Sequence, residues 1–131
     1  TGVYPPVSVL PSLSRLMKDG IGEGFTRADH PDVANQLFSA YAKVQDARAL
    51  ASVIGEEELS ETDRDYLVFG KMFEAHFLNQ GFDENRSIDQ TVELGWDLLG
   101  LLKREELDRM DGKLIEAHYD PSRADRFRAE L

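Results

Sequence analysis

The pattern of apolar and polar residues changes near Thr26, where an extended segment gives way to a helical period. From there, apolar side chains recur at spacings of three and four residues, which predicts amphipathic α-helices. Pro31 suits the first turn of the first helix, and Gly55 is typical of its end. The stripe that this helix is expected to bury consists of Val33, Leu37, Tyr41, Val44 and Ala51, widened by Ala40, Ala47, Leu50 and Ile54.

Two further helices carry start signals of their own. Ser60 followed by Asp63 predicts the start of the second helix, and Ser87 followed by Gln90 forms a capping box for the third. In such starts, the serine side chain accepts a hydrogen bond from a backbone N–H group that has no partner within the helix. Gly81 is expected to end the second helix. The local sequence therefore predicts where each of these helices begins.

Together these segments predict an all-α fold, an antiparallel bundle of about four to five helices over residues 25–119. Its later part is expected to include a shorter helix over 104–110 and one or two turns over 114–118. Residues 1–24 are rich in proline and glycine, which predicts an extended arm ahead of the bundle. Residues 120–131 are mostly polar, and we expect this tail to be frayed.

The net charge of the chain limits the classes of partner that it is expected to bind. The formal net charge is −10, which argues against a nucleic-acid partner because phosphate binding needs a basic face. The same charge argues against binding to an anionic membrane surface. No apolar run approaches the roughly 20 residues of a membrane span, so direct membrane insertion is not expected. The charge remains compatible with a basic protein as partner.

No stretch of the sequence predicts catalysis by this chain alone. The segment GIGEGFT (residues 20–26) resembles a phosphate-binding loop, but Phe25 stands where a Walker A loop has lysine. A flexible connector is the better interpretation, since glycine tolerates unusual backbone angles. The three histidines lack a His or Cys at metal-ligand spacing, and the chain has no cysteine, so we expect no metal site. We also expect the isolated domain to hold no cofactor.

Residues 56–65 read EEELSETDRD and carry half of the net charge of the chain in ten positions. Six carboxylates and one arginine give this stretch a net charge of −5. Two interpretations stay open at this point. Acidic residues near a helix start are stabilised by the helix dipole, so the cluster is explained as a solvated helix start. Alternatively, it is a patch that meets a basic partner, because clustered charge steers association.

Five stretches in series resemble one known family. In order and spacing, they are similar to the C-terminal part of the B subunit of archaeal A-type ATP synthases and related vacuolar-type ATPases. The resemblance covers about residues 2–119, and it departs from the family at Lys103, where proline is expected. The stretches are YPPVSVLPSLSRL (4–16), DGIGEGFTRADH (19–30), VQDARALASVIGEEELSETDR (44–64), NQGFDENRSI (79–88) and WDLLGLLKREEL (96–107).

The resemblance implies a role inside a larger machine. The family's B subunit is the non-catalytic, regulatory subunit, and it alternates with catalytic A subunits in a hexameric head around a rotating central shaft. Residues 1–24 would then close a nucleotide-binding domain, and the helical domain would follow. The complex makes or hydrolyses ATP, coupled to proton or sodium transport. Its head lies on the cytoplasmic side, peripheral to the inner face of the membrane.

The resemblance also implies site residues. Arg15, in the SLSR motif, would reach as an arginine finger towards ATP or ADP bound at the interface with the neighbouring A subunit. Tyr4 and Ser14 are candidates for contact with that nucleotide. The acidic cluster falls where helical domains of such heads face the shaft, which makes its side chains partner-binding candidates. These candidates are Glu56, Glu57, Glu58, Glu61 and Asp63.

A second function, from a different class, is a free-standing acidic helical-bundle adaptor that binds a basic protein. An adaptor would have an ordered N-terminus and a hydrophobic groove. A domain of a larger subunit would instead have a loose, proline-rich arm with its apolar residues, such as Val7 and Val9, exposed.

Overall fold

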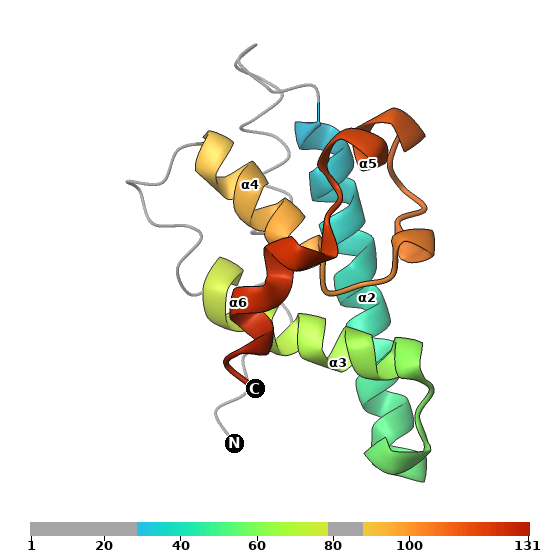
Figure 1. Ribbon diagram of the computed structural model, residues 1–131. Helices are drawn as coiled ribbons and strands as arrows, with labels where there is room; N and C mark the ends of the chain where they lie inside the picture. The colour runs from blue at the N-terminus through green and yellow to red at the C-terminus, as the bar shows by residue number, and fades with distance from the viewer. Residues whose placement is uncertain (1–28, 79–87) are drawn as a thin grey trace.

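A computed structural model describes residues 29–78 and 88–131, and over these ranges the chain is helical (Figure 1). The predicted all-α class is confirmed, since the described residues contain five α-helices and no strand. The α-helices are α2 (His30–Ile54), α3 (Glu61–Met72), α4 (Ile88–Leu99), α5 (Gly112–His118) and α6 (Asp125–Arg128). Short 3₁₀ turns are η2 (Glu56–Glu58), η4 (Arg104–Glu106) and η5 (Pro121–Ala124), and η3 (Phe73–Leu78) is a π-helical extension of α3.

The predicted end of α2 at Gly55 and the predicted start of α3 at Ser60 are both confirmed. Gly55 ends α2 with a φ of 89°, a left-handed region that glycine enters without steric cost, and its N–H donates to the Ala51 carbonyl. The Ser60 hydroxyl accepts a hydrogen bond from the backbone N–H of Asp63 at 3.1 Å and so caps α3. The end of one helix and the start of the next are therefore determined by local sequence.

Two glycines allow the three longest helices to approach closely. A Cβ atom on Gly70 would lie 2.4 Å from a methyl carbon of Val44, so α3 packs directly against α2 at this point. A Cβ atom on Gly95 would lie 2.7 Å from a methyl carbon of Val33, so α4 also packs directly against α2. Real Cβ atoms essentially never lie this close to another heavy atom, so a side chain at either position would force its neighbours to move. The glycines therefore set the spacing of the helices around the core.

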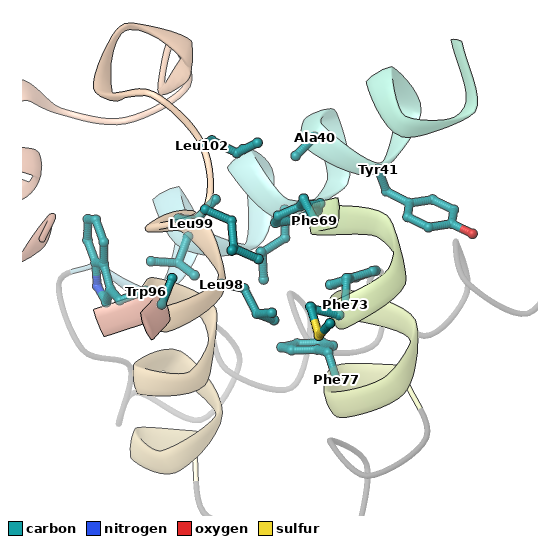
Figure 2. Close-up of a cluster of buried hydrophobic side chains, with 14 of the residues drawn as sticks. Ala40, Tyr41, Phe69, Phe73, Phe77, Trp96, Leu98, Leu99 and Leu102 are labelled. Atoms are coloured by element: carbon teal, nitrogen blue, oxygen red, sulfur yellow. The ribbon is translucent and has the colours of Figure 1, made fainter. Parts of the chain in front are cut away.

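The core between α3 and α4 is aromatic. Phe69, Phe73 and Phe77 follow one another at four-residue intervals, with ring centroids 5.5 and 5.0 Å apart. Figure 2 shows Leu98 of α4 pointing towards Phe73 and Phe77, while Trp96 lies on the other side of α4. All of these side chains are fully buried. Aromatic pairs at such distances contribute about 0.5–1.5 kcal/mol beyond burial itself.

A partly buried polar network also joins α2 to the end of α3. Arg48 binds Glu74 through two parallel hydrogen bonds of 2.8 and 2.9 Å, and the Tyr41 hydroxyl donates to the same carboxylate at 2.6 Å. Burial alone would raise the pKa of Glu74, but these hydrogen bonds hold it below its usual range. The carboxylate therefore stays charged and keeps the pairing that fixes the two helices to each other.

The segment predicted as a helix over 104–110 is not one, and this prediction is wrong. Only η4 is helical, as a single 3₁₀ turn, and the chain then runs along α2 without forming a helix. Buried Gln36 of α2 accepts a hydrogen bond from the Arg109 N–H at 2.7 Å and donates to the Glu106 carbonyl at 3.3 Å. These contacts replace the bonds of a helix. The helix starts later, where Asp111 caps the N–H of Lys113.

The tail expected to be frayed is folded instead. Within residues 120–131, η5 packs against α4, α6 follows it, and Ala124 and Phe127 are completely buried. Arg123 forms ion pairs with Glu93 and Asp97 of α4. Three of the seven polar residues that suggested fraying are arginines, and two of these pair with Asp97 of α4. The tail closes one side of the domain (Figure 1).

Candidate partner-binding site

The acidic cluster lies at one end of the domain, where α2 turns into α3. Figure 1 shows the last turns of α2 and this connection extending beyond the other described elements. We call residues 50–61 the tip. Every residue from 52 to 58 is exposed, so this part of the tip contacts little else in the described chain. The tip is therefore available to another molecule.

The turn at the tip has a defined shape. Leu59 is buried and holds the turn against the domain, with 5% of its surface exposed. Arg64 donates to the backbone carbonyl of Glu57 at 2.7 Å, which fixes the 3₁₀ turn from the side of α3. Ser60 caps α3 directly after it. The side chains that precede Leu59 are consequently carried on a fixed backbone.

Glu56, Glu57 and Glu58 are the open part of the predicted cluster. All three side chains are exposed, and none of them forms an ion pair with another described residue. The printed sequence contains no lysine or arginine between Arg48 and Arg64. Three negative charges in consecutive positions are therefore left for solvent or for a partner.

The other acids of the cluster lie in the first turns of α3, and one of them, Asp65, is hydrogen-bonded to Lys103. Lys103 lies 3.0 Å from Asp65 and 3.6 Å from Glu61, and the hydrogen bond to Asp65 is the main reason that the pKa of Lys103 is raised. Asp63 is half-buried in the first turn of α3, and its N–H is capped by Ser60. The structure thus separates the three consecutive open glutamates from Glu61, which lies near Lys103, and from Asp63, which is half-buried in the first turn of α3.

The tip also has an apolar component, which the sequence pattern did not predict. Leu50 and Ile54 were expected to be buried with the α2 stripe, but they are 40% and 43% exposed, and Val53 is 80% exposed. These side chains are exposed because α2 continues beyond the elements that cover its earlier turns, so its last turn has little to pack against. A helical period identifies a face but does not show where its cover ends. The sequence contains one indication of this exposure, because three acidic residues follow the apolar face almost directly.

The predicted nucleotide-contacting residues Arg15, Tyr4 and Ser14 lie outside the described residues. Within the described ranges, no group of three His, Asp or Glu side chains is arranged to hold a metal ion. The same part of the chain contains no helix with both the length and the apolar character needed to cross a membrane. At the tip, the described residues offer exposed carboxylate and aliphatic side chains.

The fold and the tip together define an all-α domain with an exposed, acidic end suited to protein contact. Residues 19–119 match the protein family described as the C-terminal domain of V and A type ATP synthase. The chain belongs to this family, and the resemblance seen in the sequence is confirmed.

Individual relatives agree with this family. The chain is 60% identical over 118 residues to the V-type ATP synthase beta chain of Halothermothrix orenii, covering 90% of this chain and 26% of that protein. It is 54% identical over 125 residues to the B subunit of the A-type ATP synthase of Halorubrum lacusprofundi, covering 95% of this chain and 26% of the relative. The chain thus spans about a quarter of the length of these relatives, which include bacterial and archaeal proteins.

Proposed function

We propose that this chain acts as the C-terminal helical domain of the B subunit in a rotary ATP synthase or ATPase, with its tip towards the central shaft. In this role the domain transmits contacts and has no catalytic activity of its own. The complex would couple ATP synthesis or hydrolysis to ion transport, with its head on the cytoplasmic side of the membrane. Family membership supports the assignment to the C-terminal domain of the B subunit. The exposed, acidic tip supports the contact with the shaft.

The exposed glutamates of η2 are the observation that carries the shaft contact. A surface that faces a rotating partner must exchange its contacts repeatedly, and deep pockets or buried ion pairs would resist this. Exposed ion pairs suit the task, because each contributes only about 0–1 kcal/mol and exchanges readily. Glu56, Glu57 and Glu58 have this exposure and form no ion pair with the described residues.

The rigid attachment of the tip supports the same role. The tip is continuous with α2, the longest described helix, which spans 25 residues and packs against both α3 and α4. A force applied at the tip would therefore reach the core of the domain directly. The Arg48–Glu74 pair and the close contact at Gly70 fix α3 to α2 just behind the tip.

We further propose that the nucleotide site lies at the interface with the catalytic A subunit. Arg15 would supply a planar, permanent cation that bridges phosphate oxygens there, and Tyr4 and Ser14 would contact the same ATP or ADP. These three assignments come from the resemblance of the N-terminal stretch alone. Family membership favours this function over the free-standing adaptor.

Neutralising four glutamates of the tip tests the shaft contact. We expect a variant with Glu56, Glu57, Glu58 and Glu61 changed to Gln to associate with the purified shaft more slowly than wild type. Charge clusters act mainly on the association rate, and their effect is screened over a Debye length of about 8 Å at physiological salt. The measurement is the association rate of the reconstituted head with the shaft across a salt series.

Two controls accompany this measurement. A variant with Glu105, Glu116 and Glu130 changed to Gln and Asp108 changed to Asn alters net charge equally but lies outside the tip. Unchanged thermal unfolding of the tip variant shows that the fold is intact. Equal association rates for wild type and the tip variant at low salt would contradict the proposal and leave the cluster as a solvated helix start.

A further inference from the structure

The last turn of α2 presents three large aliphatic side chains to solvent. Leu50, Val53 and Ile54 are spaced three and four residues apart, so they lie on one face of the helix. Their exposed fractions are 40%, 80% and 43%. We call these three residues the apolar patch. Exposed apolar groups that adjoin one another, rather than occurring singly, mark interaction sites.

The apolar patch is bordered on its C-terminal side by charge of a single sign. Gly55 alone separates Ile54 from the three exposed glutamates of η2. The cations nearest in sequence are already bound within the domain, Arg48 to the Glu74 carboxylate and Arg64 to the Glu57 carbonyl. A partner that covers the patch would therefore meet negative charge along one edge.

This combination specifies the partner chemically. A helix with an apolar row flanked by lysine or arginine matches both parts of the tip at once: its row covers the aliphatic side chains, and its cations face the glutamates. An acidic or purely polar segment would satisfy neither. The patch lies at the projecting end of a helix, so it would touch one face of such a partner without enclosing it (Figure 1).

We propose that Leu50, Val53 and Ile54 form an apolar seat for a basic amphipathic helix of the shaft, and that Val53 is its central contact. This inference rests on the proposed function. It assigns separate roles to the two parts of the tip: the glutamates set how fast the shaft associates, and the apolar seat sets how long it stays. Apolar attraction is non-directional, so such a seat holds a helix without preventing it from turning.

Val53 offers the sharpest test because its side chain is the most exposed of the three. Changing Val53→Ser removes the apolar contact with little effect on the domain. Full burial of a valine side chain is favourable enough that its loss corresponds to about a tenfold change in an equilibrium constant, so we expect the head to dissociate from the purified shaft roughly tenfold faster. The association rate should change less than about twofold. The increase in dissociation rate should persist at high salt, where the charge effect is screened.

The matched control is Val53→Leu, which keeps the seat apolar and should dissociate at the wild-type rate. Val53→Thr nearly preserves the shape of valine but replaces one methyl group with a hydroxyl, so it should dissociate faster than wild type even if the serine variant folds poorly. Unchanged dissociation in both the serine and threonine variants, with intact thermal unfolding, would overturn the apolar seat. If the glutamine variant still associates slowly, only the seat fails. If wild type does not bind the shaft, the proposed function fails as well.

Discussion

Changing Phe127→Ala should destabilise the chain by about 3–5 kcal/mol, the usual cost of removing a buried phenylalanine. The Phe127 ring is completely buried, with its centroid 4.9 Å from that of His76, and the Arg126 guanidinium lies 4.6 Å from the same centroid. Its loss would leave a cavity between the tail and the end of α3. Equilibrium denaturant unfolding of the chain measures the effect as a shift of the midpoint.

A second change to alanine in the same tail provides the control. Leu131 is 66% exposed, so Leu131→Ala should alter the free energy of unfolding by no more than about 0.5 kcal/mol. A loss below about 1 kcal/mol for Phe127→Ala would mean that the tail does not pack on the core. The expectation of a frayed tail would then have been correct in solution.

The largest effect on activity is expected at Arg15. In the assembled complex, Arg15→Ala should slow ATP hydrolysis by about 10³-fold or more, which is the range of arginine fingers in phosphoryl transfer. An arginine of this kind stabilises charge that develops on the transferring phosphate, so the rate should fall more than nucleotide affinity. Steady-state hydrolysis and nucleotide binding, measured on the same reconstituted complex, separate the two effects.

Arg15→Lys is the informative companion variant. Lysine keeps the positive charge but lacks the planar fork that bridges two oxygens, so we expect only partial recovery of the rate. Size-exclusion chromatography should show that both variants assemble as wild type does. Normal turnover in an assembled Arg15→Ala complex would remove this residue from the active site.

The parts of the fold that were predicted correctly depend on local chemistry. Gly55 and Ser60 mark the end of α2 and the start of α3 because a left-handed residue and a hydroxyl cap act within one or two turns. The helical period likewise identified Val33, Leu37 and Val44 as buried. Such features can be seen in sequence because neighbouring residues alone determine them.

The parts that were missed depend on which segments meet in space. The segment after Lys103 forms no α-helix because Gln36, some seventy residues earlier, binds its backbone. The tail folds because Ala124 and Phe127 are buried against the domain and two of its arginines pair with Asp97 of α4. No local sequence pattern predicts either of these long-range contacts. These two expectations failed because segments distant in sequence pack against each other.

The candidate site divides along the same line. The acidic cluster could be seen directly in the sequence, but its division between open glutamates and acids with contacts in the domain required the position of Lys103. The exposure of Val53 and its neighbours could not be predicted from period alone, since the same spacing is buried earlier in α2. Only the length of α2 relative to its cover explains that change.

The central claim is that the tip faces the shaft, and site-specific photo-crosslinking tests it most directly. The chain contains no cysteine, so Glu57→Cys provides one attachment point for a photoreactive maleimide, introduced before the complex is assembled. Glu116→Cys on α5 is the control, because Glu116 is also exposed and α5 lies near the opposite end of α2 (Figure 1).

We expect light to join Glu57→Cys to a component of the shaft and to stop ATP hydrolysis in the joined complexes, since a fixed shaft cannot turn. The Glu116→Cys complex should give no shaft product and keep its activity. Equal shaft products from both positions, or full hydrolysis after the tip has been joined to the shaft, would contradict the account.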